Sequence, residues 1–247
     1  MNGRVYLVGA GPGDLGLITV KGKELLAQAD VVLYDALANP ELLDVCRKDA
    51  ELVFAGKRGG NHFLTQSETN ELLVKYAKEG KTVVRLKGGD PFLFGRGAEE
   101  AEELRDAGVE VSVVPGVSSS IAVPELAGIP VTHRDHASMV TFVTGHEKED
   151  RAEDRVDWKA LAESHGTIVV MMGLGNAGRI SGELIEGGMS PDTPAAIITD
   201  GSTPKQRVEV TIVSDLEKTI SEKKLKAPGI MVIGGVVSVR EIIGDMQ

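Results

Sequence analysis

Short β-branched strands alternate with helical segments through the first half of the chain, and this alternation constrains the fold more than any other feature. Asn39-Pro40 is typical of an N-cap followed by proline at the first helical position, and Thr65–Glu68 fits a capping box. Near-continuous apolar strands joined by helices predict a parallel sheet covered on both faces. We expect its strands at residues 4–8, 31–34, 51–54, 82–86 and 109–114.

The second half departs from this pattern. Its predicted strands 195–199 and 206–213 are separated only by Asp200–Lys205, which is too short for a helical crossover. The two strands are therefore expected to pair antiparallel, which makes the second sheet mixed. The other strands of this half are expected near 139–144, 167–172 and 229–235.

A chain of 247 residues can form two modest α/β domains, each able to bury a core. The alternation of strands and helices stops at Pro115-Gly116, which is the expected domain boundary. The sequence therefore predicts an N-terminal α/β domain over residues 1–114 and a C-terminal α/β domain over residues 115–247.

The charge balance and the cysteine count restrict the partners and the compartment. The chain has 27 Lys and Arg against 37 Asp and Glu, a net charge of −10, which argues against nucleic-acid and anionic-membrane partners. The single cysteine, Cys46, excludes an intramolecular disulfide. No apolar run approaches the ~18 residues of a membrane span, and no basic region followed by a long apolar one indicates a signal peptide. We expect a cytoplasmic protein.

The segment GAGPGD at residues 9–14 follows the first strand and invites comparison with the dinucleotide fingerprint G-x-G-x-x-G. Asp14 stands at the last fingerprint position, where its carboxylate would repel a pyrophosphate, and Pro12 lacks one of the N–H groups that such a loop donates. A dinucleotide site is therefore disfavoured. A nucleotide-dependent dehydrogenase stays open as an alternative, because Asp30 or Asp35 could serve as the ribose partner.

The most informative stretch is VVRLKGGDPFLFGRGAEE at residues 83–100. Gly88 and Gly89 end a strand and allow a ligand to contact the main chain. Pro91 keeps Asp90 out of helical geometry, and no Walker motif follows. From the residues alone, a tight structural turn and a ligand-binding turn fit equally well.

Eight blocks of this sequence resemble the uroporphyrinogen-III C-methyltransferases of the tetrapyrrole methylase family, in the family's order. They are GAGPGD, VVLYDAL, GKRGGNHFLTQ, VVRLKGGDPFLFGRGAEE, VVPGVSSS, AGIPVTHRD, TFVTGH and MMG. The resemblance runs from residue 4 to about residue 243. It implies two α/β domains, the first with a mainly parallel sheet and the second with a mixed sheet, S-adenosylmethionine in the cleft between them, and a homodimer. It also implies methylation of uroporphyrinogen III at C-2 and C-7, giving precorrin-1 and then precorrin-2. The bifunctional members carry a dehydrogenase and chelatase module for which this chain has no room.

The resemblance also assigns residues to the cofactor. This sequence departs from the family pattern at Met171, where tyrosine is usual, at Gly229, where alanine is common, and at Ala98, where glycine is usual. The implied cofactor residues are Pro12, Gly88, Gly89, Asp90, Leu93, Ser118, Ser119, Met172, Gly201 and Gly229.

Asp35 and Lys57 match the positions that the resemblance marks as proton acceptor and proton donor. An electron-rich pyrrole carbon attacks the methyl group of a cationic sulfur, so the transfer depends mainly on alignment. The substrate must then lose a proton, which a carboxylate in a partly desolvated site can accept. Taken without the resemblance, Asp35 is more typical of a turn and Lys57 of a solvated strand end.

Uroporphyrinogen carries eight carboxylates, so its pocket should be basic, and arginine forks bind carboxylates well. The candidate substrate residues beside the motifs are Arg58, His62, Arg96 and Arg134, to which Lys57 and His133 could add donors. His133 and His136 lie three residues apart, but no acid or cysteine completes a zinc pattern, so no metal is expected.

Three alternatives remain beside this function. One is a sibling enzyme of the same fold, such as another precorrin methylase or a diphthine-synthase-like methylase. The second is the nucleotide-dependent dehydrogenase, and the third is a non-catalytic module that binds ligand without turnover.

Overall fold

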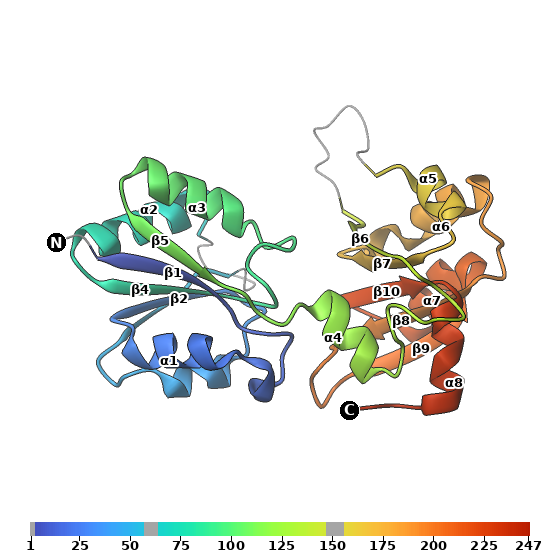
Figure 1. Cartoon of the computed structure of the whole chain (residues 1–247), viewed down its shortest axis with the longest axis horizontal. Coiled ribbons are helices and arrows are strands. Elements are labelled where there is room, and N and C mark those ends of the chain that lie inside the picture. Colours follow the sequence, from blue (N-terminus) through green and yellow to red (C-terminus); the bar gives the residue numbers. More distant parts are fainter. Residues whose placement is uncertain (1–2, 57–63, 147–155) are drawn as a thin grey trace. The chain divides into compact units, whose positions relative to one another are not determined.

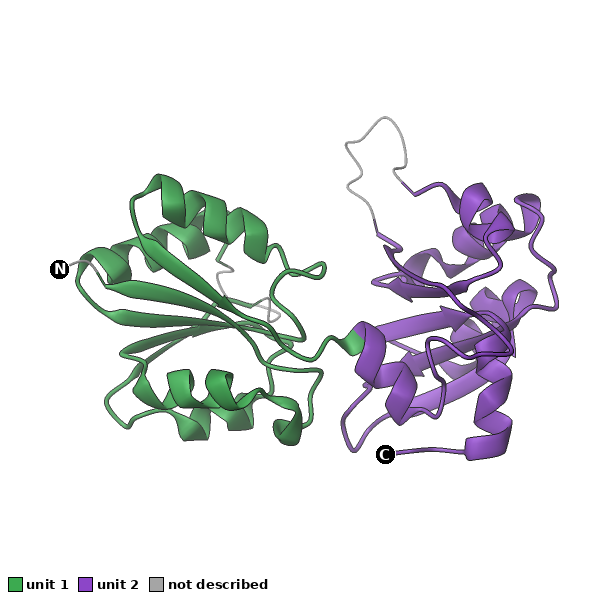
Figure 2. Ribbon diagram, in the orientation of Figure 1, with its two compact units in different colours: residues 1–119 green, residues 120–247 purple. Residues whose placement is uncertain are grey.

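The computed structural model describes residues 3–56, 64–146 and 156–247 of the chain (Figure 1). The chain divides into two compact units, residues 1–119 and 120–247 (Figure 2). The last strand of the first unit ends at Val114, and the loop after it leads to helix α4, Ser119–Leu126, which contains the point of division.

The first unit is built on a parallel five-stranded sheet in the order β3-β2-β4-β1-β5. This confirms the predicted parallel sheet. The strands start and end within one residue of the predicted positions. They are β1 (Arg4–Gly9), β2 (Val31–Tyr34), β3 (Glu51–Phe54), β4 (Thr82–Lys87) and β5 (Glu110–Val114).

Helices cover both faces of this sheet (Figure 1). Helices α2 (Gln66–Lys78) and α3 (Gly97–Asp106) lie on one face, where Leu73 and Leu104 pack with Val83. Helix α1 (Val20–Gln28) and the 3-10 helix η2 (Pro40–Val45) lie on the other, where Leu26 packs with Val84 and Leu86. Each such leucine stabilises the fold by roughly 1.5–3 kcal/mol through the apolar surface it buries.

The predicted helix starts are present. The Thr65 hydroxyl accepts from the N–H of Glu68 at 3.2 Å, and the Glu68 carboxylate accepts from the N–H of Thr65 at 2.6 Å, which completes the capping box of α2. Asn39 caps η2 by accepting from the N–H of Glu41 at 3.0 Å. The helical segment that starts at Pro40 is a 3-10 helix. A further 3-10 helix, η1, spans Leu15–Leu17.

The second unit holds a mixed sheet in the order β6-β7-β10-β8-β9. β6 and β7 pair parallel, and the remaining neighbours pair antiparallel. β8 and β9 form the antiparallel pair that the short connection predicted. The strands are β6 (Val140–Thr144), β7 (Thr167–Met171), β8 (Pro194–Thr199), β9 (Arg207–Ile212) and β10 (Gly229–Ile233).

Two apolar cores lie on either side of this second sheet. One joins Trp158, Ile180 and Leu216 to strand residues such as Ile168, and the other includes Val123 and Val237. The remaining helices are α5 (Trp158–Glu163), η3 (Leu174–Asn176), α6 (Ala177–Glu186), η4 (Val213–Asp215), α7 (Leu216–Lys223), η5 (Gly235–Val239) and α8 (Arg240–Ile243).

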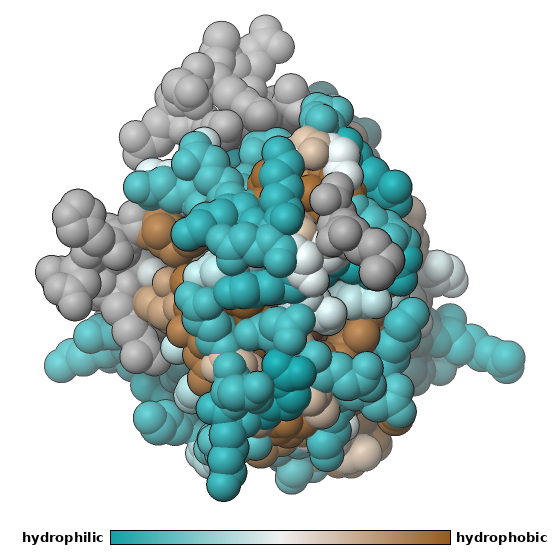
Figure 3. All heavy atoms as spheres, turned by 90° about the vertical axis from the view of Figure 1, so that its left-hand side faces the viewer, coloured by the Kyte–Doolittle hydropathy of each residue, from teal (hydrophilic) through white to brown (hydrophobic). Residues whose placement is uncertain are grey.

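Charged residues make up 26% of the chain, and the described surface is correspondingly hydrophilic (Figure 3). On the face shown in Figure 3, hydrophilic side chains cover most of what the structure describes, with apolar side chains scattered between them. Within the described ranges, no helix combines the length and the apolar character needed to cross a membrane.

Candidate functional site

Two glycine loops that follow neighbouring strands are joined through their backbones. β1 runs into the loop that contains Pro12, and β4 runs into the turn Gly88–Asp90. The N–H of Gly89 donates to the carbonyl of Gly11 at 2.7 Å, and the N–H of Gly11 donates to the carbonyl of Gly89 at 3.2 Å. Both glycines have a positive φ, 80° at Gly11 and 65° at Gly89, where other residues are strained. The fold thus places two separately predicted ligand loops side by side at the carboxyl ends of the strands.

The Asp90 carboxylate organises this region. Its Oδ1 accepts from the N–H groups of Phe92 at 2.8 Å and Leu93 at 3.1 Å, and its Oδ2 accepts from the N–H of Gly116 at 3.1 Å. The side chain therefore fixes the turn after β4 and ties it to the loop after β5. These bonds are a structural role for Asp90 that sequence reasoning did not give it.

The loop after β5 brings Ser118 and Ser119 to the same region. A methyl group on Gly89 would lie 3.7 Å from the backbone nitrogen of Ser119, so the turn and the start of α4 adjoin. The cofactor candidates of the first unit therefore lie on three loops that contact one another. They are Pro12, Gly88, Gly89, Asp90, Leu93, Ser118 and Ser119.

Asp35 follows β2 at the same end of the sheet. Its Oδ1 accepts from the N–H groups of Leu37 at 3.1 Å and Ala38 at 3.2 Å, which is the turn role considered from the sequence. The carboxylate also reaches the neighbouring strand, where the N–H of Gly88 lies 3.3 Å from Oδ1 and 3.4 Å from Oδ2. A quarter of the Asp35 side chain stays exposed. The candidate proton acceptor is thus held against the glycine turn.

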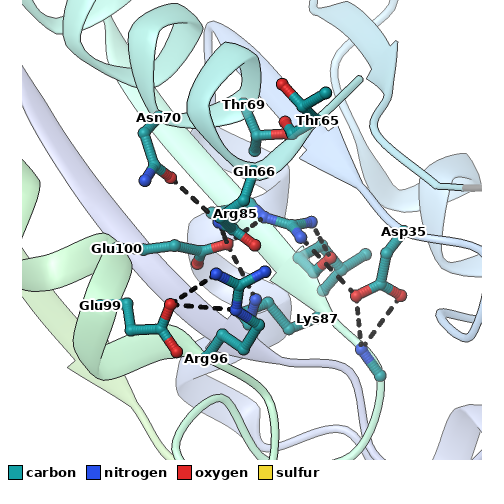
Figure 4. A network of polar contacts seen from close by, with 12 residues as sticks. Asp35, Thr65, Gln66, Thr69, Asn70, Arg85, Lys87, Arg96, Glu99 and Glu100 are labelled. Carbon is teal, nitrogen blue, oxygen red and sulfur yellow. Dashed lines mark hydrogen bonds and ion pairs between the residues drawn. The ribbon is translucent and has the colours of Figure 1, made fainter. Parts of the chain in front are cut away.

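A buried charged network lies beside Asp35 (Figure 4). Glu100 of α3 is fully buried, and its Oε1 accepts from Arg85 Nε at 3.2 Å, Lys87 Nζ at 3.0 Å and Gln66 Nε2 at 3.0 Å. Arg85 Nη2 lies 3.8 Å from Oδ2 of Asp35. Because buried charges are costly without partners, this pairing accounts for the tolerance of both cations in the core. Burial is the main cause that lowers the pKa of Lys87, followed by the charge of Arg85, while Glu100 opposes the shift.

Sequence reasoning missed this network. Arg85 and Lys87 occupy alternate positions of β4, on the face that Val83 shares with α2 and α3. Two cations in succession on the covered face of a predicted strand are the signal that could have identified it.

In the second unit, three cofactor candidates gather at one edge of the sheet. Gly229 begins β10 and pairs with Thr199 at the end of β8, two residues before Gly201. Met172 directly follows Met171, which pairs with Ile230. Met172 has a positive φ of 56° and is 53% exposed. A Cβ at Gly201 would lie 2.6 Å from a methyl group of Val123, so this position excludes a side chain.

The basic candidates differ in their surroundings. The Arg96 guanidinium binds Glu99 at 2.5 and 3.0 Å on the exposed start of α3, and the hydrogen bond to Glu99 raises the pKa of Arg96. Arg134 lines an open pocket of about 320 Å³ in the second unit, together with His136, Met139 and His165. Lys57, Arg58 and His62 lie outside the described residues.

The two neighbouring histidines do not form a recognisable metal site. The rings of His133 and His136 lie 4.9 Å apart, centroid to centroid, and tilted against each other. Over residues 3–56, 64–146 and 156–247, no cluster of three His, Cys, Asp or Glu side chains has metal-binding geometry.

With this geometry established, comparison with known proteins decides the family. The family model described as "Tetrapyrrole (Corrin/Porphyrin) Methylases" matches residues 4–217. The chain belongs to the tetrapyrrole methylases. The S-adenosyl-L-methionine-dependent uroporphyrinogen III methyltransferase of Methanosarcina barkeri is 50% identical over 245 residues, covering 99% of this chain and 96% of that protein.

Two further relatives define the extent of the likeness. The siroheme synthase of Actinobacillus pleuropneumoniae serotype 7 is 50% identical over 97% of this tetrapyrrole methylase, which spans about half, 48%, of that longer protein. The crystal structure of the uroporphyrin-III C-methyl transferase from Thermus thermophilus complexed with S-adenyl homocysteine shares 38% identity. Its TM-score is 0.81, over 96% of this chain and 94% of that one. The predicted architecture of two α/β units, parallel and then mixed, is confirmed.

Proposed function

We propose that this tetrapyrrole methylase is an S-adenosylmethionine-dependent uroporphyrinogen-III C-methyltransferase. It transfers methyl groups to C-2 and C-7 of uroporphyrinogen III, giving precorrin-1 and then precorrin-2, and releases S-adenosylhomocysteine. The observation that carries the proposal is 50% identity, over nearly the whole length of both chains, to the Methanosarcina barkeri enzyme. The sibling enzymes considered as alternatives share the fold, but the 50% identity to a uroporphyrinogen III methyltransferase does not support them.

The reaction needs an aligned methyl group and an acceptor for the proton that the substrate loses. We assign the proton acceptor to Asp35, which is partly exposed and fixed by the N–H groups of Leu37, Ala38 and Gly88. A carboxylate held in one orientation loses little entropy when the substrate arrives. Lys57 is assigned as the proton donor on the resemblance alone.

For the cofactor, we propose contacts through main chain as much as through side chains. Gly88 and Gly89 expose the backbone of the turn after β4, and Asp90 holds that turn in shape. The Val123 side chain at Gly201 and the Leu174 side chain at Gly229 leave little room for a side chain at either glycine. The remaining proposed contacts are Pro12, Leu93, Ser118, Ser119 and Met172.

For the substrate, we propose that basic side chains bind the carboxylates of the macrocycle. The candidates are Arg58, His62, Arg96 and Arg134. Arg96→Ala is expected to raise the KM for uroporphyrinogen III about tenfold and to leave the KM for S-adenosylmethionine unchanged. Arg179→Ala is the matched control, because Arg179 also pairs with a glutamate on its own helix, Glu183 at 2.7 Å. An unchanged substrate KM in Arg96→Ala would remove Arg96 from the site.

The assembly and compartment belong to the same proposal. We infer a cytoplasmic homodimer, which multi-angle light scattering of the purified protein and fractionation of cells test directly. A monomeric mass would contradict the dimer.

Calorimetry tests the cofactor class. S-adenosylhomocysteine is expected to bind and NAD to give no heat of binding, because Asp14 opposes a pyrophosphate in the loop after β1. Binding of NAD without S-adenosylhomocysteine would instead favour the dehydrogenase. Binding of S-adenosylhomocysteine without methyl transfer to any tetrapyrrole would favour the non-catalytic module.

A further inference from the structure

The register of two adjacent strands places Arg85 beside Asp35. β2 and β4 pair parallel, with Leu33 opposite Arg85 and Tyr34 opposite Leu86. Side chains alternate along a strand, so Arg85 shares the α2/α3 face with Leu33 and with the next position on that side, Asp35. The two charged residues are therefore neighbours on one face, at the end of the sheet where the candidate site lies.

The Arg85 guanidinium is held at three points (Figure 4). Nε donates to Oε1 of Glu100 at 3.2 Å, Nη1 donates to the carbonyl of Leu86 at 3.2 Å, and Nη2 lies 3.8 Å from Oδ2 of Asp35. A guanidinium is planar, so the first two contacts fix the direction in which Nη2 points. That direction is toward the Asp35 carboxylate.

The anchor of this arrangement is itself rigid. Glu100 is fully buried on α3, and Lys87 and Gln66 bind the same Oε1 atom that Arg85 binds. Arg85 and Lys87 together carry two positive charges, and Glu100 supplies one negative charge. Asp35 supplies the second, so each of the two carboxylates faces a cation of the described network.

We infer that Arg85, anchored by Glu100, is a positioning residue that holds the Asp35 carboxylate for proton transfer. This inference rests on the proposed function, in which Asp35 accepts the proton. Arg85 itself need not touch substrate. The two carboxylate oxygens of Asp35 have different neighbours. Oδ1 accepts the turn hydrogen bonds from Leu37 and Ala38, whereas Arg85 approaches Oδ2. Arg85 therefore restrains Oδ2 together with the N–H of Gly88, which lies 3.4 Å from the same oxygen.

A double-mutant cycle tests the inference through the reaction. Arg85→Lys keeps the charge but cannot make three fixed contacts. It is expected to lower kcat about tenfold, which is the size of effect by which residues in contact couple. The KM for S-adenosylmethionine should stay within about twofold of the wild type. In an Asp35→Asn background, the same change is expected to alter kcat less than about twofold. If Arg85→Lys lowers kcat by the same factor in both backgrounds, the inference is overturned. A general structural effect of Arg85 on kcat would not depend on whether Asp35 is present.

Leu104→Ala supplies the matched control. Leu104 is buried on α3 like Glu100 but packs in the apolar cluster. Its substitution is expected to destabilise the unit and to have the same effect on kcat in both Asp35 backgrounds. Arg85→Met, which keeps the side-chain length and leaves Glu100 paired with Lys87 at 3.0 Å, is the second variant should Arg85→Lys fail to fold, and the same coupling to Asp35 is expected.

Hydrogen exchange tests the inference without turnover. The amides of Leu37, Ala38 and Gly88 donate to Asp35. In Arg85→Lys they are expected to exchange at least about tenfold faster than in Leu104→Ala at matched global stability, because the carboxylate that accepts from them becomes mobile. Unchanged protection of these three amides would overturn the positioning role. The wild type is tested separately for methylation of uroporphyrinogen III. If Arg85→Lys loses protection at these amides but the wild type does not methylate uroporphyrinogen III, the positioning role is upheld and the proposed function is rejected.

Discussion

Gly9 and Gly116 pack backbone against backbone: a Cβ built on Gly116 would lie 2.7 Å from the Cα of Gly9 and would overlap the carbonyl oxygen of Gly89. Gly9 ends β1, and Gly116 lies in the loop after β5. No side chain larger than hydrogen fits between these three backbones. The close approach is what allows the loops after β1, β4 and β5 to form one surface.

Gly116→Ala is expected to lower the free energy of unfolding by roughly 1–3 kcal/mol, because the added methyl group must displace backbone. Affinity for S-adenosylhomocysteine should fall as well. Calorimetry and urea unfolding measure the two effects. Gly182→Ala is the control: it lies inside α6 with nothing within 4 Å of an added Cβ. It should raise stability by roughly 0.5–1 kcal/mol and leave binding unchanged. Wild-type binding by Gly116→Ala would contradict the backbone-packing argument.

Asp90→Asn keeps one carbonyl oxygen for the N–H groups of Phe92 and Leu93 but places an amide where Oδ2 accepts from Gly116. The N–H of Gly116 then loses its acceptor, at a cost of roughly 1–3 kcal/mol. Urea unfolding measures the loss. The exposed Asp106→Asn on α3 should change stability by less than about 0.5 kcal/mol. Equal stability of the two variants would show that the Asp90–Gly116 bond is dispensable.

Glu100→Gln leaves the buried Arg85 and Lys87 without their shared anion. Loss of one member of a buried ion pair costs roughly 3–5 kcal/mol, so the thermal midpoint should fall sharply. Glu103 lies on the exposed face of the same helix, and Glu103→Gln should keep the free energy of unfolding within about 0.5 kcal/mol of the wild-type value. A small effect of Glu100→Gln would mean that the two cations find other partners.

The Tyr76 hydroxyl donates to the Glu51 carboxylate, and this bond, with burial, raises the pKa of Tyr76 from the ordinary 10.0 to about 12. Above about pH 10 the unfolded chain releases this proton while the folded chain keeps it, so the contribution of Tyr76 to stability declines as pH rises toward about 12. The difference in unfolding free energy between the wild type and Tyr76→Phe should therefore shrink over this range. A difference that stays constant between about pH 10 and pH 12 would contradict the shift.

Local signals gave much of the fold. The capping residues Thr65 and Glu68 bind each other across three positions of the sequence, so the sequence alone predicts their role. The antiparallel pairing of β8 and β9 follows from a connection too short to cross over. After Pro40, the same local signal gave the start of a helix but not its 3-10 geometry.

The polar interior of the first unit was not predicted, because it depends on relationships distant in sequence. Arg85 meets Asp35 only through the register of β2 with β4, and Glu100 arrives from a helix. The hydrogen bond from Gly116 to Asp90 likewise joins loops after two different strands. Motif and spacing identified the loops, whereas their mutual contacts required the folded chain.

Methyl transfer to uroporphyrinogen III is the reaction that separates the proposed function from its alternatives. The most direct measurement is an anaerobic incubation of the purified protein with enzymatically generated uroporphyrinogen III and methyl-labelled S-adenosylmethionine, read by product mass. The expected product carries two labelled methyl groups. No gain of label, from a protein that still binds S-adenosylhomocysteine, would contradict the proposed function.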